Sequence, residues 1–162
     1  MTIEPRQARG FTLIEMVVVV LIVGILASAA MPLAALNKRR AQEAELRQSL
    51  RTIRTALDNY KHAWDQGRIE KKTDDSGYPP TLDVLVNGVI DVSVATPRPT
   101  RLYFLRSLPR DPFADPMLPA FETWGLRSYA SPPDAPAAGR DVFDVHSMAE
   151  GVGLDGTPYR QW

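Results

Sequence analysis

The sequence contains no cysteine and only two histidines, His62 and His146. A chain without cysteine forms no disulfide and offers no thiolate to a metal ion, so cysteine usage says nothing about its compartment. The 19 basic and 19 acidic residues cancel, which removes a general electrostatic reason to bind nucleic acid. With 162 residues, the chain has room for one domain with a hydrophobic core and an appendage, but not for two large domains.

One long stretch, residues 11–36, is almost free of charge. A helix of about 26 residues is roughly 39 Å long, which is enough to cross a hydrocarbon layer of ~30 Å. Val17–Val20 are β-branched, but in lipid a helix still forms because the backbone must satisfy its own hydrogen bonds. We therefore predict a membrane-spanning helix over residues 11–36, bent near Pro32.

The exception in this stretch is Glu15. A carboxylate inside a membrane helix costs about 2.5–3.5 kcal/mol, and the surrounding sequence is expected to offer it no partner. Two ordinary interpretations compete: a signal anchor, and a secretory signal cleaved after the small residues Ala27-Ser28-Ala29. Neither explains why a charge is kept at this position.

The amino-terminal residues carry a resemblance to a known family. A short basic leader ends at Gly10, and Phe11-Thr12-Leu13-Ile14-Glu15 opens the apolar helix. This arrangement resembles the class III signal of type IV pilins and type II secretion pseudopilins. The resemblance implies that a prepilin peptidase removes the leader, residues 1–10, by cutting between Gly10 and Phe11, and that Phe11 is N-methylated. It also implies that Glu15 pairs with the Phe11 amine of a neighbouring subunit in a filament, where screening is weak.

Beyond residue 36, an apolar stripe continues at helical spacing through residues 37–66. Its members recur every three or four positions: Leu46, Leu50, Ile53, Leu57, Tyr60 and Trp64. We expect this amphipathic helix to pack on the core of a globular domain over residues 37–162; a free-standing coiled coil is the alternative. The basic residues between 38 and 54 are expected to face solvent, lipid headgroups or a filament contact. No nucleic acid is expected as a partner, because no aromatic side chains are interleaved with them.

The remaining sequence predicts short elements between loops. Residues 66–77 indicate a loop, and Thr81 is expected to cap a short helix that stops at Gly88. Strand patterns cover residues 89–95 and 141–147. Nine prolines between 97 and 136 limit regular structure there to short pieces such as 102–105 and 126–130. The predicted fold class is α+β, in which a long amino-terminal helix packs on a small antiparallel sheet. The resemblance implies the same pilin-like fold.

Within the family, the resemblance is to the major pseudopilins of type II secretion. It rests on Tyr78-Pro79, on the stretch LPRDPFADP at 108–116, and on Phe143–Ser147 before a glycine-rich tail. The family's tail binds calcium, but this tail is shorter and less acidic. Ser147, Glu150 and Asp155 are the ligands it would offer to a structural calcium ion, and no other cofactor is expected. The alternative is that Asp155 only caps its own turn.

Catalysis has little support in the sequence. Asp141 and Asp144 could form a carboxylate pair, and His146-Ser147 a base and a nucleophile. Adjacent residues on a strand point to opposite faces, however, which separates His146 from Ser147. Asp144 is expected to face inward together with Val142 and His146. We therefore expect no enzyme.

The resemblance implies a structural subunit that polymerises into a periplasmic pseudopilus and drives type II protein secretion. The alternative is a type IV pilin or minor pilin of a surface fibre used for adhesion, motility or DNA uptake. Expected partners are further copies of the chain, the prepilin peptidase, other pseudopilins and the secretion platform of the inner membrane. The expected location is the inner membrane, crossed once, with the carboxy-terminal domain in the periplasm.

Overall fold

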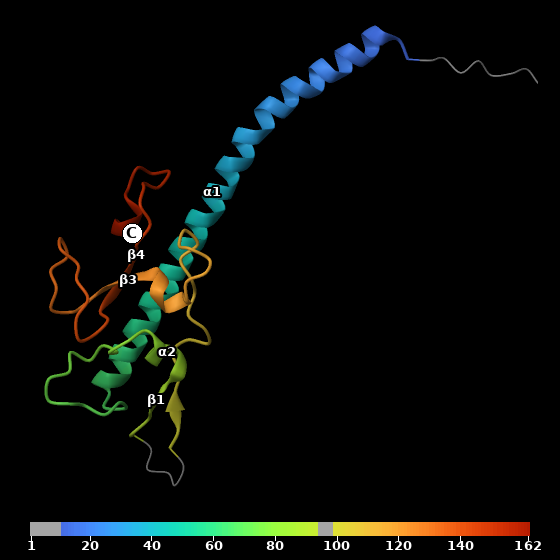
Figure 1. Cartoon of the computed structure of the whole chain (residues 1–162). Helices are drawn as coiled ribbons and strands as arrows, with labels where there is room; N and C mark the ends of the chain where they lie inside the picture. Colours follow the sequence, from blue (N-terminus) through green and yellow to red (C-terminus); the bar gives the residue numbers. More distant parts are fainter. Residues whose placement is uncertain (1–10, 94–98) are drawn as a thin grey trace, which may run out of the picture. The chain divides into compact units, whose positions relative to one another are not determined.

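The computed structural model describes residues 11–93 and 99–162. The leader with Gly10, the last positions of the strand predicted at 89–95, and the side chains of residues 29–32 including Pro32 lie outside the described part. The elements are, in chain order, α1 (Leu13–Asp65), α2 (Asp83–Asn87), β1 (Val89–Ile90), β2 (Arg101–Leu102), η1 (Ala120–Thr123), β3 (Trp124–Arg127), β4 (Asp144–Ser147) and η2 (Tyr159–Gln161) (Figure 1). This order confirms the predicted α+β, pilin-like fold.

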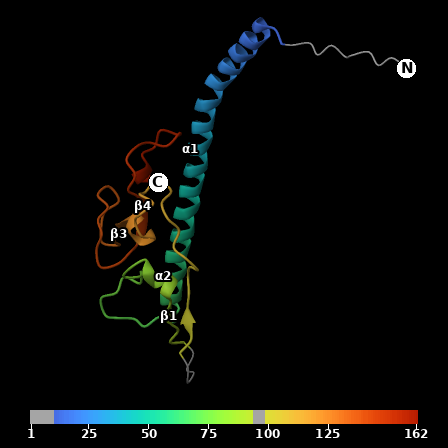
Figure 2. The same cartoon turned by 45° about the vertical axis from the view of Figure 1, so that its right-hand side comes forward.

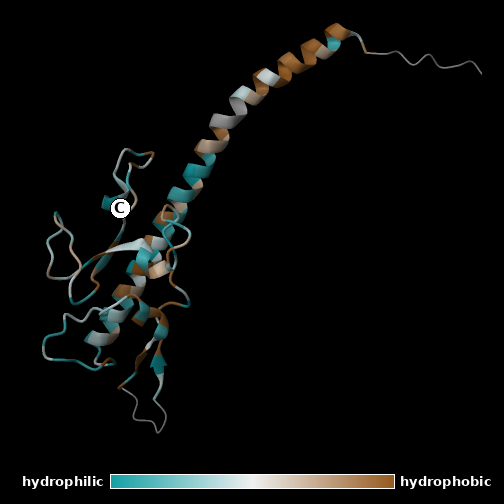
Figure 3. Ribbon diagram, viewed as in Figure 1, coloured by the Kyte–Doolittle hydropathy of each residue, from teal (hydrophilic) through white to brown (hydrophobic). Residues whose placement is uncertain are grey.

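The chain divides into two compact units, Met1–Arg40 and Ala41–Trp162. Within the first unit, α1 begins with apolar side chains that no described part of the chain covers, from Leu13 at 83% exposed to Val18 at 44%. Figure 3 shows this apolar start of α1 in brown. By length and composition α1 is long and apolar enough to cross a membrane. The predicted division at residues 1–10, 11–36 and 37–162 stays a prediction.

In the second unit, the apolar stripe of α1 lies in the hydrophobic core. Leu46, Leu50, Ile53, Leu57 and Tyr60 are buried, and Trp64 packs at the edge of the same cluster. Ala56 and Ala63 of α1 are buried in the same cluster, and the rest of the unit contributes Ile69, Leu82, Leu85, Trp124, Val142, Val145 and Tyr159. In both views, α2, β3 and β4 lie beside this part of α1 (Figures 1 and 2). The stripe is therefore core, as predicted, and the coiled-coil alternative is wrong.

Two separate antiparallel sheets of two strands each complete the unit. In one, β1 pairs with β2, with Val89 opposite Leu102. In the other, β3 pairs with β4, with Trp124 opposite Ser147 and Arg127 opposite Asp144. The strand predicted at 89–95 and the alternation at 141–147 correspond to β1 and β4, which are shorter than expected, while β2 and β3 overlap the short pieces of regular structure predicted at 102–105 and 126–130.

Local hydrogen bonds explain why β1 and β2 end early. After β1, the Asp91 carboxylate accepts hydrogen bonds from the Ser93 amide and hydroxyl, and this turns the chain. After β2, the amides of Phe104 and Leu105 both donate to the Leu85 carbonyl rather than to a strand partner. The backbone groups are satisfied without a longer ladder.

The start of α2 differs from the prediction, and its end agrees with it. Leu82, not Thr81, occupies the N-cap position, and no side chain caps the helix there. At the other end, Gly88 has a φ of +72°, which favours glycine, and a Cβ at this position would lie 2.7 Å from the Leu102 carbonyl oxygen. Gly88 therefore stops α2 and lets β2 approach.

Candidate functional site

The amino-terminal end of α1 is closed by Thr12 and Glu15. The Glu15 carboxylate accepts a hydrogen bond from the Thr12 amide at 2.9 Å and another from its hydroxyl at 2.8 Å. The Glu15 amide in turn donates to the Thr12 hydroxyl oxygen at 3.3 Å. This reciprocal pattern is a capping box, which satisfies two amides at the start of a helix.

The expectation that the surrounding sequence offers Glu15 no partner was therefore wrong. Thr12 is that partner within the same chain. The signal was present in the sequence as a threonine followed three positions later by a glutamate before an apolar run.

The capped end of α1 carries apolar side chains around its single charge. A pocket of about 450 Å³ is lined by Phe11, Ile14, Glu15, Met16, Val18 and Val19. Phe11, with 80% of its surface exposed, lies at the beginning of this pocket. The first unit thus presents a carboxylate within an apolar surface, and that combination suits a partner with an apolar body and a positive charge.

The three residues proposed for calcium have separate roles in the structure. Ser147 is fully buried, and its hydroxyl donates to the carboxylate of Asp111. Asp155 accepts a hydrogen bond from the Thr157 amide at 2.9 Å and forms an ion pair with Arg47 at 2.7 Å. Glu150 is exposed. Among the described residues, no group of three or more histidine, aspartate or glutamate side chains is placed to hold a metal. Calcium binding stays a prediction.

The buried face of β4 is the opposite of the predicted one. Val145 and Ser147 are buried, whereas Asp144 is half-buried and pairs with Arg54 at 2.8 Å. Burial lowers the pKa of His146, although the nearby Asp144 carboxylate opposes the shift. His146 packs against Gly125, where a Cβ would lie 2.2 Å from Nε2 of the ring. Ser147 therefore meets Asp111, not His146, and the two do not form a base and nucleophile pair.

The predicted pair of Asp141 and Asp144 is likewise not formed as a unit. The Asp141 carboxylate accepts hydrogen bonds from the Ser128 hydroxyl at 2.9 Å and the Tyr129 amide at 2.8 Å. Asp144 accepts from Arg54 and from the Val145 amide. Each carboxylate thus organises its own stretch of backbone.

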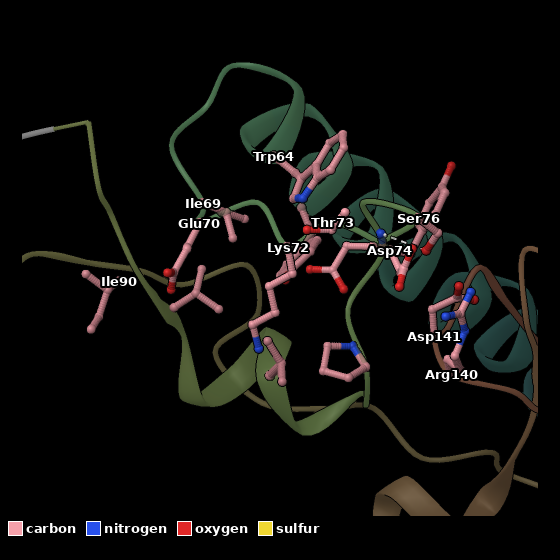
Figure 4. A pocket seen from close by; sticks show the side chains of 16 residues that line it. Trp64, Ile69, Glu70, Lys72, Thr73, Asp74, Ser76, Ile90, Arg140 and Asp141 are labelled. Atoms are coloured by element: carbon pink, nitrogen blue, oxygen red, sulfur yellow. Dashed lines mark hydrogen bonds between the residues drawn. The ribbon is translucent and has the colours of Figure 1, made fainter.

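The second unit contains a pocket of about 530 Å³ beside the end of α1 (Figure 4). Opposite charges line it, with Glu70, Asp74 and Asp141 on its wall together with Lys72 and Arg140. Asp75 also lines the pocket, so four carboxylates face two cations, and we assign the pocket no ligand.

Comparison with known proteins places these features in a family. A family model described as the prokaryotic N-terminal methylation motif matches residues 5–31. The type II secretion system core protein G of Aeromonas hydrophila is 35% identical over 120 residues, which cover 70% of this chain and 73% of that protein. The protein of the same name from Vibrio cholerae is 33% identical over 156 residues, or 93% of this chain and 90% of that protein. The one from Pseudomonas aeruginosa is 32% identical over 116 residues, covering 70% and 73%. No solved structure matches the chain.

Proposed function

The chain belongs to the family of type II secretion core protein G, the pseudopilins, and from that premise we propose that it polymerises through α1 into a periplasmic pseudopilus that drives protein export. The single observation that carries the proposal is the capped start of α1, where Glu15 lies among exposed apolar side chains. No part of the described chain covers this surface. In the filament, the same helix of a second copy covers it with its own apolar side chains.

Glu15 exchanges partners in this proposal. In the single chain its carboxylate is satisfied by Thr12. In the filament it meets the amino group of Phe11 from a neighbouring subunit, once the leader has been removed after Gly10 and Phe11 has been methylated. An ion pair in an apolar bundle is strongly coupled, so it fixes the position of one subunit against the next.

The remaining parts of the proposal follow from the same premise. The membrane helix holds the subunit in the inner membrane, which it crosses once, with the carboxy-terminal domain, residues 37–162, in the periplasm. The prepilin peptidase, other pseudopilins and the inner-membrane secretion platform are its partners, and its role is structural rather than enzymatic. The three relatives described above carry the secretion name, and no observation favours the surface fibre.

The partner exchange is tested with Glu15→Gln, which keeps the size of the side chain and its bond to Thr12 but removes the charge. We expect pelletable filaments and secretion to be lost while the subunit still enters the membrane. Glu45→Gln, at an exposed position of the same helix, is the matched control and leaves assembly unchanged. Filaments at the normal level with Glu15→Gln would contradict the proposed role.

Processing is tested separately by intact mass. The mature chain is expected to begin at Phe11 and to carry one extra methyl group, and Gly10→Val is expected to leave the precursor uncut in the membrane. A mature chain that begins at Ala30 would instead indicate an ordinary secretory signal.

A further inference from the structure

The carboxy-terminal segment, residues 147–162, is attached to one face of α1 by charged side chains. Three residues of α1 reach it: Glu43, Arg47 and Arg54. Their positions i, i+4 and i+11 fall on the same side of an α-helix. The same stretch of helix that carries the core stripe thus also holds the end of the chain.

Arg47 contacts this segment at Asp155 and at its last residue, Trp162. Its guanidinium forms the ion pair with Asp155 at 2.7 Å and lies over the Trp162 ring, 4.1 Å from the ring centroid. A planar cation stacked on an indole and bonded to a carboxylate is a geometry that arginine satisfies better than lysine. The positive charge of Arg47 therefore lies next to the Asp155 carboxylate, where a metal ion would otherwise bind.

Glu43 and Arg54 hold the segment on either side of Arg47. Glu43 is only 5% exposed, and its carboxylate accepts hydrogen bonds from the Leu154 amide and the Tyr159 hydroxyl, each at 2.9 Å. Arg54 donates to the Val145 carbonyl at 3.0 Å and to the backbone oxygen of Trp162 at 2.8 Å. The buried polar groups at this contact are thus satisfied by protein atoms.

The segment also has its own internal bonds. The Gly153 amide donates to the Thr157 carbonyl at 2.7 Å, and the Gly156 amide donates to the Gly153 carbonyl at 2.9 Å. A Cβ at Gly153 would lie 2.4 Å from the Trp162 ring, so the turn closes directly on the indole. The turn at Gly153 therefore packs against the Trp162 ring.

The donor set does not fit calcium in this arrangement. Calcium prefers six to eight oxygen ligands at about 2.3–2.6 Å. Of the three expected side chains, Ser147 is bonded to Asp111 and Asp155 is paired with a guanidinium, which leaves only the exposed Glu150. A divalent cation on Asp155 would lie against the positive charge of Arg47, which opposes its binding.

We propose that Arg47 takes the place of a metal ion in this chain, so that the carboxy-terminal segment folds onto α1 without calcium. Glu43 and Arg54 fix the same segment by hydrogen bonds to its backbone. The proposal concerns the fold of the subunit and does not depend on whether the subunit polymerises.

The test is hydrogen exchange of residues 151–162 in the full chain in detergent, read by mass spectrometry. We compare about 10 mM calcium, which exceeds the ~10⁻³ M dissociation constants of weak calcium sites, with excess chelator. The amides of Gly153, Leu154 and Gly156 donate hydrogen bonds, so their exchange reports directly on the segment. We expect equal exchange in both conditions. Slower exchange with calcium would overturn the proposal.

A pair of variants tests the role of Arg47. Arg47→Gln is expected to speed exchange of residues 151–162 by about 3- to 10-fold, because an exposed ion pair and a cation–π contact are both lost. Arg51→Gln is the matched control, since Arg51 lines the same shallow surface pocket but bonds to Gln48, and it is expected to leave exchange unchanged. Arg47→Lys should give an intermediate rate. Equal exchange rates for the Arg47→Gln and Arg51→Gln variants would overturn the specific role of Arg47.

Discussion

The two parts of α1 differ in where their apolar side chains find cover. In the second unit, Leu46 and Ile53 are completely buried by residues from the rest of the same unit. In the first unit, Ile14, Val19 and Leu26 stay more than half exposed. The second part of the helix therefore stabilises the folded domain, whereas the first part keeps an apolar surface that the described chain does not cover, as the proposed contact with lipid or other copies requires.

The largest expected effect comes from removing a core side chain of the second part. Leu57→Ala should lower the free energy of unfolding by about 2–5 kcal/mol, because it leaves a cavity among buried neighbours. Val19→Ala, in the first part, should leave the unfolding of the globular unit unchanged. Denaturant unfolding of both variants in detergent measures this difference. An equal decrease in the free energy of unfolding for both variants would contradict the difference between the two parts.

A pair of glycine variants sharpens the same comparison. Gly125→Ala should cost about 1–3 kcal/mol, because the new Cβ would lie 2.2 Å from the His146 ring. Gly24→Ala meets no atom within 4 Å outside the helix backbone and its neighbours, and should stabilise the first part of the helix slightly. Thermal unfolding of the two variants checks the sign of each effect. The double variant Gly125→Ala/His146→Ala lacks the ring and should recover part of the lost stability. If it recovers none, the His146 ring is not the cause of the destabilisation.

Acid should weaken the second unit through Asp91. Hydrogen bonds from Arg68 and Ser93 lower the pKa of Asp91 to about 2, against about 3.9 for an unfolded chain. Because the folded pKa is the lower one, the stabilisation is complete above pH ~4 and is lost as the pH falls toward 2. Unfolding of wild type and Asp91→Asn between pH 5 and 2 measures it, and the variant should show a flatter dependence. Parallel curves would contradict this role.

The parts of the structure that follow from spacing could be predicted from the sequence. The stripe from Leu46 to Trp64 repeats with the helical period, so its burial needed no further information. The capping box of Thr12 and Glu15 depends only on neighbouring residues, and the spacing of a threonine and a glutamate before an apolar run indicates it.

The parts that depend on distant contacts could not be predicted in the same way. Arg47 and Asp155 are 108 positions apart, and nothing in either local sequence indicates their pairing. The buried face of β4 does not follow from Val142, because this buried residue lies before the strand and not in it. The burial of Ser147 follows from Asp111, which comes from a proline-rich loop with little regular pattern.

Contact between copies of the chain through the first part of α1 can be measured by crosslinking in cells that contain the secretion machinery. A photoreactive p-benzoylphenylalanine replaces Val19, which lines the pocket beside Glu15. We predict a light-dependent ladder of adducts between copies of the chain, which disappears when Glu15→Gln is added. Adducts with lipid alone, or a ladder of equal strength in the Glu15→Gln background, would contradict the account that this surface is covered by other subunits under the control of Glu15.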